Sequence, residues 1–246
     1  MKRLFLFAFV GCLLPSAEAQ TVRIAAAANL KFVLDDIRTL YISSHPDATI
    51  DLTYGSSGLL CQQILSGATF DIFLSADRSY PERLAREKAT TGGVRTYAFG
   101  KLALWSTTID VADVGIVNEP SVRSIAIGKP DVAPYGDRAI QCLKSYGLYD
   151  KVRQKLVYAD NISQAAEYVA TGSADAGFVP LSLLRAPGLK KQGSYVVLDE
   201  KSYAPIEQGG VLIAAEKPNA EAVRFFDFLT GPACKQIFEK NGYNVP

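Results

Sequence analysis

The chain has 246 residues, of which 48% are hydrophobic, and its 26 basic and 25 acidic residues give a net charge of +1. This balance predicts no broad basic field, which argues against nucleic acid or a membrane surface as a partner. Since His45 is the only histidine, the chain excludes a metal site of several histidines and any Ser-His-Asp triad that uses another histidine.

The first 19 residues have the pattern of an export signal. Lys2 and Arg3 precede an apolar stretch over 4–14, and an Ala-Glu-Ala cleavage site ends at Ala19. The apolar stretch is shorter than the roughly 20 residues that span a bilayer. We therefore expect a signal peptide over 1–19, cleavage after Ala19 and a periplasmic mature protein.

The cysteines bear on two questions: whether the protein is secreted free or as a lipoprotein, and whether it contains disulfide bonds. A lipoprotein anchored through Cys12 is the alternative, although Phe9 stands where a lipobox has Leu. Cys61, Cys142 and Cys234 remain after cleavage, an odd number in an oxidising compartment, and they are too far apart for a metal-binding spacing. At least one must be free or paired with another molecule, and we expect each to be a small buried side chain.

Strand-like and helix-like segments alternate along the mature chain. Strands are predicted over 22–26, 48–54, 70–75, 97–106, 124–128, 155–159, 176–180, 195–198 and 208–214. Helices are predicted after Asn29, with a stripe of Val33, Leu34, Ile37, Leu40 and Tyr41, after Ser57 up to Gly67, and over 79–88, 137–146, 162–170, 220–229 and 232–240. This alternation implies an α/β protein with parallel or mixed sheets and helices on both faces. A two-domain arrangement would place its hinge near 99–102 and 206–209.

Four junctions between a strand and a helix carry polar or hydroxyl residues. The start of a helix has backbone N–H groups without partners and a positive dipole end, which suits an anion. Ligands of such sheets bind at the carboxyl ends of the strands. The candidate donors are Asn29 and Ser57 through their side chains, Tyr135 through its phenol, and Ile162 through its backbone N–H.

Any one of these residues could be an ordinary helix cap, and only the set favours an anion site. No Lys or Arg occurs at the junctions, and none of the four donor positions is Asp or Glu. A cage that offers only neutral donors suits a fully ionised tetrahedral oxyanion, whereas a protonated one also needs an acceptor.

Other candidate chemistry is weaker. Asp77 could lie at the mouth of a cleft, cap the following helix or pair across domains, and we favour a structural role. The glycines around Ser57 do not form a P-loop, because the Lys-Ser/Thr pair is missing. A secreted hydrolase that uses Ser57 is a further alternative, but no general base lies near it in the sequence. Trp105 is expected in the core.

The chain resembles the periplasmic molybdate-binding proteins of ABC transporters, the ModA family, over essentially its whole mature length. The resemblance rests on Ile24 to Leu30, Gly55-Ser-Ser57 with Gln63-Ile64, Phe70 to Asp77, Ile127 to Pro130 with Pro134-Tyr135-Gly136, Ala174 to Val179, Phe228 to Pro232 and Asn241-Gly-Tyr243. No single motif is decisive, but their order and spacing are specific.

The resemblance implies a type II periplasmic-binding-protein fold, in which two α/β domains with mixed sheets are joined by two hinge crossovers. Domain I would cover 20–100 and 208–246, and domain II would cover 101–207. Carried over residue by residue, the oxyanion contacts would be Asn29 and Ser57 in domain I, and Tyr135 and the backbone of Ile162 in domain II. Ala28 matches a position where some relatives have a hydroxyl residue, so it could give only its N–H.

One position departs from part of the family. Some members have a Tyr ligand where this chain has Pro180, and relatives with Tyr at the position of Tyr135 lack that other one. The chain therefore resembles the second subgroup, in which Tyr135 supplies the phenol.

The function that follows is a binding protein rather than an enzyme. It would capture molybdate, and tungstate with it, and deliver the anion as a monomer to an ABC permease in the inner membrane, with no cofactor, no metal held as a cation and no nucleic acid. Sulfate, phosphate or another oxyanion is the alternative cargo.

Overall fold

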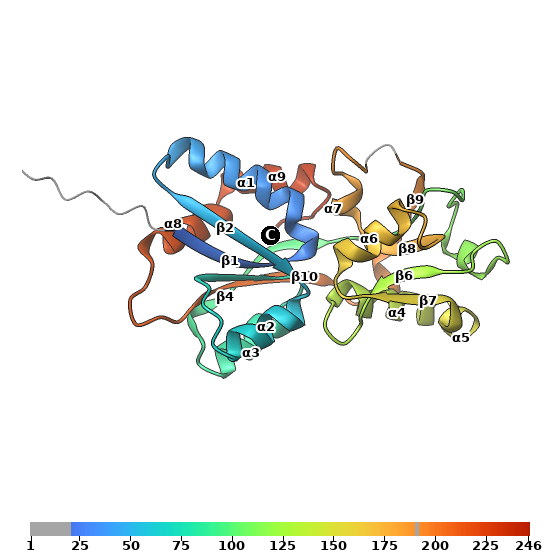
Figure 1. Cartoon of the computed structure of the whole chain (residues 1–246), viewed down its shortest axis with the longest axis horizontal. Helices are drawn as coiled ribbons and strands as arrows, with labels where there is room; N and C mark the ends of the chain where they lie inside the picture. The colour runs from blue at the N-terminus through green and yellow to red at the C-terminus, as the bar shows by residue number, and fades with distance from the viewer. Residues whose placement is uncertain (1–20, 190–191) are drawn as a thin grey trace, which may run out of the picture.

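The computed structural model describes residues 21–189 and 192–246, so the predicted signal peptide, its cleavage site and Cys12 lie outside the described residues. Two five-stranded sheets form two lobes that lie side by side (Figure 1). Each sheet contains parallel and antiparallel neighbours. The predicted fold class, α/β with two mixed sheets, is confirmed.

The first sheet has the strand order β2-β1-β3-β10-β4. Its strands are β1 (Thr21–Ala27), β2 (Thr49–Gly55), β3 (Ile72–Ser75), β4 (Thr90–Gly100) and β10 (Ile206–Ile213). The helices of this lobe are η1 (Ala28–Leu30), α1 (Lys31–Ser44), α2 (Ser57–Leu65), α3 (Ser79–Arg86), α8 (Ala220–Leu229) and α9 (Pro232–Lys240).

Side chains of β1 alternate between two cores because successive residues of a strand point to opposite faces. Val22, Ile24 and Ala26 pack with the buried residues of α1, α8 and α9. Ala25 packs on the other face, with Leu60 of α2 and Leu84 of α3. The sheet therefore lies between two helical layers, and its strands β1, β2 and β3 run parallel with their carboxyl ends toward the second lobe (Figure 1).

The second sheet has the strand order β7-β6-β8-β5-β9. Its strands are β5 (Leu102–Ser106), β6 (Ile125–Gly128), β7 (Leu156–Ala159), β8 (Ala176–Pro180) and β9 (Ser194–Val197). Its helical segments are η2 (Val114–Asn118), α4 (Pro134–Ser145), α5 (Tyr149–Val152), η3 (Arg153–Lys155), α6 (Ile162–Ala170), α7 (Leu181–Leu184) and η4 (Glu200–Ser202). Figure 1 shows α6 on one face of this sheet and α4 on the other.

The chain passes between the sheets at two places. Lys101 alone separates β4 from β5, and the segment after β9 returns through η4 to β10. The prediction of one strand over 97–106 is wrong, because this apolar run is divided between two sheets at Lys101. The same prediction missed residues 90–96, where Gly92 and Gly93 weaken the strand signal. The domain bounds and the hinge positions stay predictions.

Several predictions about single side chains can be compared with the structure. Cys61, Cys142 and Cys234 are buried, as expected, and all three are free. Trp105 is fully buried, also as expected. Leu40 was expected on the buried stripe of α1 but is 40% exposed, whereas the other four residues of the stripe are buried. Within 21–189 and 192–246, no helix is long and apolar enough to cross a membrane.

Candidate functional site

A small cavity of about 10 Å³ lies between the two lobes, at the carboxyl ends of β1 and β2. All five residues predicted to contact an anion line it: Ala28, Asn29, Ser57, Tyr135 and Ile162. The other lining residues are Ala27, Gly55, Ser56, Ala76, Ala133 and Pro134. The structure thus brings together four junctions that are far apart in the sequence.

Helix starts surround this cavity. Ser57 is the first residue of α2 and Ile162 the first of α6, while Tyr135 is the second residue of α4. Ala28 and Asn29 begin the helical segment that continues into α1. The positive ends of several helix dipoles therefore meet at one point. Among the described residues, no charged side chain lines the cavity.

The hydroxyl of Ser57 is available to donate a hydrogen bond into the cavity. Its Oγ accepts a hydrogen bond from the backbone N–H of Ala76 at 3.0 Å, and the residue is 1% exposed. Since this bond uses the oxygen as an acceptor, the O–H remains free to donate. Ser57 is thus oriented by β3 and its following turn.

The phenol of Tyr135 is likewise available to donate a hydrogen bond into the cavity. Its phenolic oxygen accepts a hydrogen bond from Nε2 of Gln208 at 3.0 Å. Burial raises the pKa of Tyr135 well above its ordinary value, so the phenol remains protonated at physiological pH. The backbone approaches closely at this point, because a Cβ on Gly100 would lie 2.0 Å from the phenolic oxygen.

Asn29 is held by partners inside the protein. Its Nδ2 donates to Oε1 of Gln208 at 3.0 Å and to the phenolic oxygen of Tyr243 at 2.9 Å. Both amide hydrogens are therefore engaged, which differs from the expectation that this side chain is a free donor. The first N–H groups of a helix have no partner within it, so the group of Asn29 available to an anion is its backbone N–H.

Two buried side-chain atoms in the described part of the chain have no hydrogen-bond partner, and both belong to lining residues of this cavity. They are Oδ1 of Asn29 and Oγ of Ser56. A buried polar atom without a partner costs free energy, and such atoms in native structures tend to mark a site for a ligand or water. Ser56 was not predicted from the sequence as an anion contact. The sequence signal that could have indicated it is its position directly before Ser57.

At the junction before α6, the predicted donor to the anion is the backbone N–H of Ile162. Asn161 caps α6, because its Oδ1 accepts a hydrogen bond from the N–H of Gln164 at 3.1 Å. This cap leaves Ile162, which is 4% exposed, facing the cavity.

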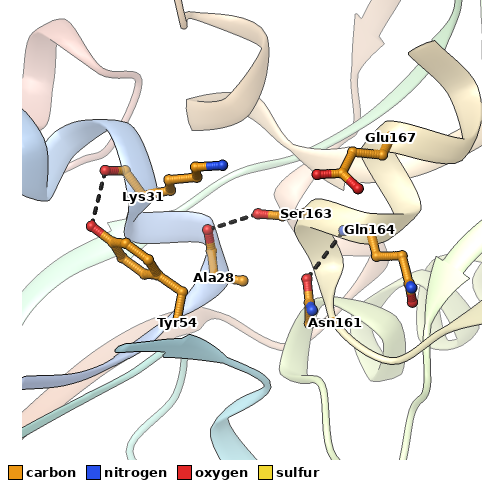
Figure 2. A pocket seen from close by; sticks show the side chains of 7 residues that line it. All are labelled: Ala28, Lys31, Tyr54, Asn161, Ser163, Gln164 and Glu167. Atoms are coloured by element: carbon orange, nitrogen blue, oxygen red, sulfur yellow. Dashed lines mark hydrogen bonds between the residues drawn. The ribbon is translucent and has the colours of Figure 1, made fainter. Parts of the chain in front are cut away.

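A second, larger pocket of about 250 Å³ adjoins the cavity and shares Ala28 with it. Figure 2 shows that α1 and β2 of one lobe face α6 of the other across it. Lys31 and Glu167 are its charged lining residues. Ser163 on α6 donates a hydrogen bond to the carbonyl oxygen of Ala28 at 2.9 Å, so the lobes touch at the boundary between the two pockets (Figure 2).

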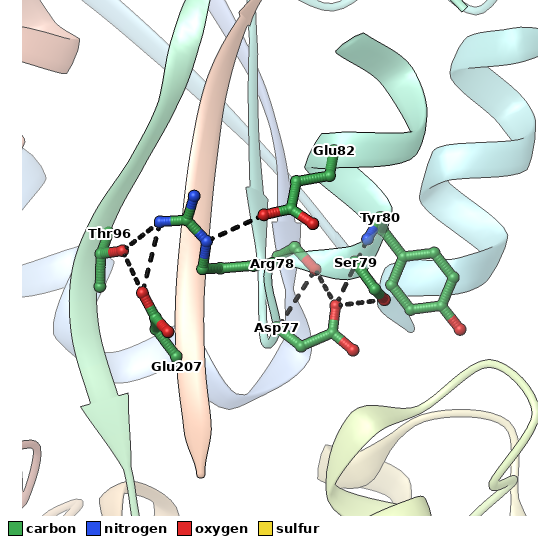
Figure 3. Close-up of polar contacts among 8 residues, drawn as sticks. Asp77, Arg78, Ser79, Tyr80, Glu82, Thr96 and Glu207 are labelled. Atoms are coloured by element: carbon green, nitrogen blue, oxygen red, sulfur yellow. Dashed lines mark hydrogen bonds and ion pairs between the residues drawn. The ribbon is translucent and has the colours of Figure 1, made fainter. Parts of the chain in front are cut away.

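Asp77 has a structural environment, as expected. Its Oδ1 accepts from Oγ of Ser79 at 3.0 Å at the start of α3 (Figure 3). Burial raises the pKa of Asp77, against the lowering effect of this hydrogen bond. The neighbouring Arg78 links α3 to the first sheet through Thr96 at 2.6 Å and Glu207 at 3.3 Å (Figure 3).

The described residues contain no group of three His, Cys, Asp or Glu side chains that could hold a metal ion. The cavity is instead a buried site between two α/β lobes, lined by uncharged residues that offer several hydrogen-bond donors and the unpaired oxygen of Asn29. Fold and site define an extracellular solute-binding protein, and a family model described as "Bacterial extracellular solute-binding protein" matches residues 22–244.

The individual proteins to which this chain is similar belong to a narrower group of solute-binding proteins. The chain is 35% identical to the molybdate-binding protein ModA of Azotobacter vinelandii over 248 residues, which is 100% of this chain and 98% of that protein. It is 37% identical to the molybdate-binding protein ModA of Rhodobacter capsulatus, over 95% of this chain and 92% of that protein. The solved structure of the Azotobacter vinelandii periplasmic molybdate-binding protein superposes with a TM-score of 0.87 at 32% identity, covering 92% of this chain and 99% of that chain. The chain belongs to the ModA family of solute-binding proteins, and it is a binding protein rather than an enzyme.

Proposed function

We propose that this protein captures molybdate, and tungstate with it, in the cavity between its lobes and delivers the anion to an ABC permease. The observation that carries the proposal is the convergence of neutral, buried donors and helix starts on one cavity without a charged lining residue. The family membership supports molybdate as the cargo, since the relatives from Azotobacter vinelandii and Rhodobacter capsulatus are molybdate-binding proteins.

The proposed contacts come from both lobes. Ser57 and Tyr135 donate through hydroxyl groups that have their hydrogens free, and Ala28, Asn29 and Ile162 donate through backbone N–H groups. Ser56 adds a buried hydroxyl that has no protein partner. Hydrogen bonds to a charged acceptor are stronger than neutral ones, so such a cage holds a dianion without a counter-charge.

The cage should discriminate by size and by protonation. Molybdate and tungstate have nearly the same size and charge, so one cage hardly separates them. Sulfate is smaller and would leave donors poorly paired, at a cost of roughly 1–3 kcal/mol for each unmet group. Hydrogen phosphate carries a proton that needs an acceptor, and the unpaired Oδ1 of Asn29 makes phosphate a necessary competitor to test.

Capture requires motion of the lobes. The cavity has a volume of about 10 Å³, which is roughly the space of one water molecule, so an oxyanion enters only when the lobes separate. We propose that domain I (20–100 and 208–246) and domain II (101–207) rotate about 99–102 and 206–209. Small-angle scattering should show a more compact protein with molybdate, and identical profiles would contradict this motion.

We also propose where the protein acts and in which oligomeric state. The protein is exported, cleaved after Ala19 and active in the periplasm as a monomer, where it meets its permease at the inner membrane. The membership in an extracellular family supports this location.

The deciding experiment is isothermal titration of the anion-stripped mature protein with molybdate, tungstate, sulfate and phosphate. The proposal predicts tight binding of one molybdate per chain, similar binding of tungstate, and no displacement by excess sulfate or phosphate. Heat with sulfate or phosphate but none with molybdate would assign the protein to another oxyanion.

A further inference from the structure

Gln208 lies behind the cavity, on the strand that returns from the second lobe to the first. It belongs to β10 and is fully buried. Its neighbour Glu207 points to the opposite face, where it bonds with Arg78 and Thr96 (Figure 3). A register shift between Gln208 and Gly209 marks a bulge in the pairing of β10 with β4, and bulges commonly redirect side chains beside a site.

The amide of Gln208 joins residues of both lobes. Its Nε2 donates to the phenolic oxygen of Tyr135, in the first turn of α4 of the second lobe, at 3.0 Å. Its Oε1 accepts from Nδ2 of Asn29 at 3.0 Å and from the hydroxyl of Tyr97 at 3.0 Å, both in the first lobe. Asn29 and Tyr135 are the proposed anion contacts, whereas Gln208 is not among the lining residues of the cavity.

This arrangement determines where the hydrogens point. Because Gln208 donates to Tyr135, the phenol acts there as an acceptor and can direct its own hydrogen to the cavity. Because Gln208 accepts from Asn29, the Asn29 amide is turned with Nδ2 away from the cavity and Oδ1 left unpaired. If the oxygen and nitrogen of the Gln208 amide exchanged places, the oxygen would accept the hydrogen of the Tyr135 phenol. The Asn29 amide would then have to turn as well, so that its oxygen accepts from Gln208.

We propose that Gln208 is a positioning residue of the anion site, which makes Tyr135 a donor to the anion by donating its own hydrogen bond to the Tyr135 oxygen. The inference rests on the proposed function, since it concerns the same site. It also assigns a role to the hinge strand, because the residue that orients contacts in both lobes sits beside the crossover near 206–209.

The test is Gln208→Glu, which changes the shape of the side chain very little. A protonated carboxyl retains one donor for Tyr135 and one acceptor for Asn29, whereas an ionised carboxylate only accepts and takes the Tyr135 hydrogen. The other titratable groups at Gln208 are Tyr97, Tyr135 and Tyr243, and burial raises the pKa of each. Asp77 acts on Tyr97 from the turn before α3, and its own pKa is raised by burial.

Molybdate affinity is measured by titration from pH 5 to pH 9 for the wild type, Gln208→Glu and Gln236→Glu. The last variant adds the same charge at an exposed position of α9 and should match the wild type. Gln208→Glu should bind nearly as well as the wild type at the acid end and lose roughly 10-fold to 100-fold as the introduced carboxyl ionises. Affinity equal to that of the wild type at every pH, or reduced equally at every pH, would overturn the proposal.

Thermal unfolding at each pH shows whether the variant is folded. If Gln208→Glu does not fold, Gln208→Met and Tyr135→Phe form a double-mutant cycle. The two losses should then be strongly non-additive, because Gln208 acts through Tyr135, and additive losses would overturn the proposal. A wild-type protein that does not bind molybdate would instead refute the proposed function, so the two failures are distinguishable.

Discussion

The hydroxyl of Ser163 in the second lobe donates a hydrogen bond to the carbonyl oxygen of Ala28 in the first, at 2.9 Å. Ala28 lines the cavity, so this bond connects the lobes at the edge of the proposed anion site. Two further bonds close the other side, from the N–H of Gly58 to the carbonyl of Val132 at 2.9 Å and from the hydroxyl of Tyr80 to the carbonyl of Asp131 at 3.0 Å. These three hydrogen bonds therefore link the two lobes on both sides of the cavity.

Ser163→Ala should weaken molybdate binding, because it removes a bond that exists only when the lobes are closed. The loss should be about 2-fold to 10-fold, since a typical hydrogen bond contributes about 0.5–1.5 kcal/mol. Titration calorimetry measures it, with Ser43→Ala as the matched control. Ser43 also donates to a carbonyl, that of Leu40, but within one helix of a single lobe. Equal effects of the two substitutions would contradict the closure role of Ser163.

Gly58→Ala should prevent full closure. A Cβ on Gly58 would lie 2.8 Å from the hydroxyl oxygen of Tyr80 and 2.9 Å from Cα of Val132, which belongs to the other lobe. Alanine also favours the helix by about 1 kcal/mol over glycine, so the fold itself should not suffer. We expect affinity to fall by 10-fold or more with an unchanged or higher unfolding temperature, where ten-fold is about 1.4 kcal/mol.

Gly93→Ala is the control for this steric argument. A Cβ on Gly93 would meet nothing within 4 Å. The control should bind as the wild type does, and a Gly58→Ala protein that also binds normally would show that the lobes need not approach this closely.

Ser57→Ala should remove one direct donor to the anion. A hydrogen bond to a charged group is worth about 1.5–3 kcal/mol, which predicts a loss of about 10-fold to 100-fold in affinity. Asn29→Ala keeps the backbone N–H that is available to the anion, so it should weaken binding less than Ser57→Ala does. It removes one hydrogen-bond donor from Gln208 and one from Tyr243 and should lower stability. Titration and thermal unfolding of both variants separate the two effects, and normal affinity of Ser57→Ala would refute the proposed site.

Ser56→Ala should change stability and binding in opposite directions. The Oγ of Ser56 is buried and has no partner, so its removal should leave the unfolding temperature of the anion-free protein unchanged or raise it. If this hydroxyl donates to the anion, molybdate affinity should nevertheless fall by about 10-fold. A variant that is less stable but binds normally would show that Ser56 has only a structural role.

Binding of molybdate to the wild type should hardly depend on pH between about 6 and 9, below the ordinary tyrosine pKa of about 10. Tyr135 is the titratable residue among the cavity-lining residues of the described chain, and burial raises its pKa well above the ordinary value. The donor form is thus present throughout this range. A loss of affinity as pH rises through 8 would mean that Tyr135 ionises or that a different group controls binding.

The helices were more predictable from sequence than the strands. The bounds predicted for α6, α8 and α9 agree with the structure, because Asn161 and Asn219 cap two of them and Pro232 starts the third. The strand β4 was predicted poorly, since its first half contains two adjacent glycines and its end runs directly into a strand of the other sheet. Local patterns cannot show at which residue a chain changes sheets.

The lining of the site could be predicted for a simple reason. The carboxyl ends of parallel strands share one edge, so polar residues that follow such strands meet there. The residues behind the cavity gave no such signal. Gln208 lies inside a strand and Tyr243 near the chain end, and they meet Asn29 across 179 and 214 positions of sequence. Such contacts depend on the packing of the lobes, which no local spacing reveals.

The most direct measurement is an anomalous difference map, at the molybdenum absorption edge, from crystals of the mature protein grown with molybdate. The proposed site predicts one strong peak between the lobes, with the oxygens of the anion within hydrogen-bonding reach of Ser57, Tyr135 and the N–H of Ile162. A peak in the larger pocket beside Lys31 and Glu167, or no peak between the lobes, would refute the proposed site.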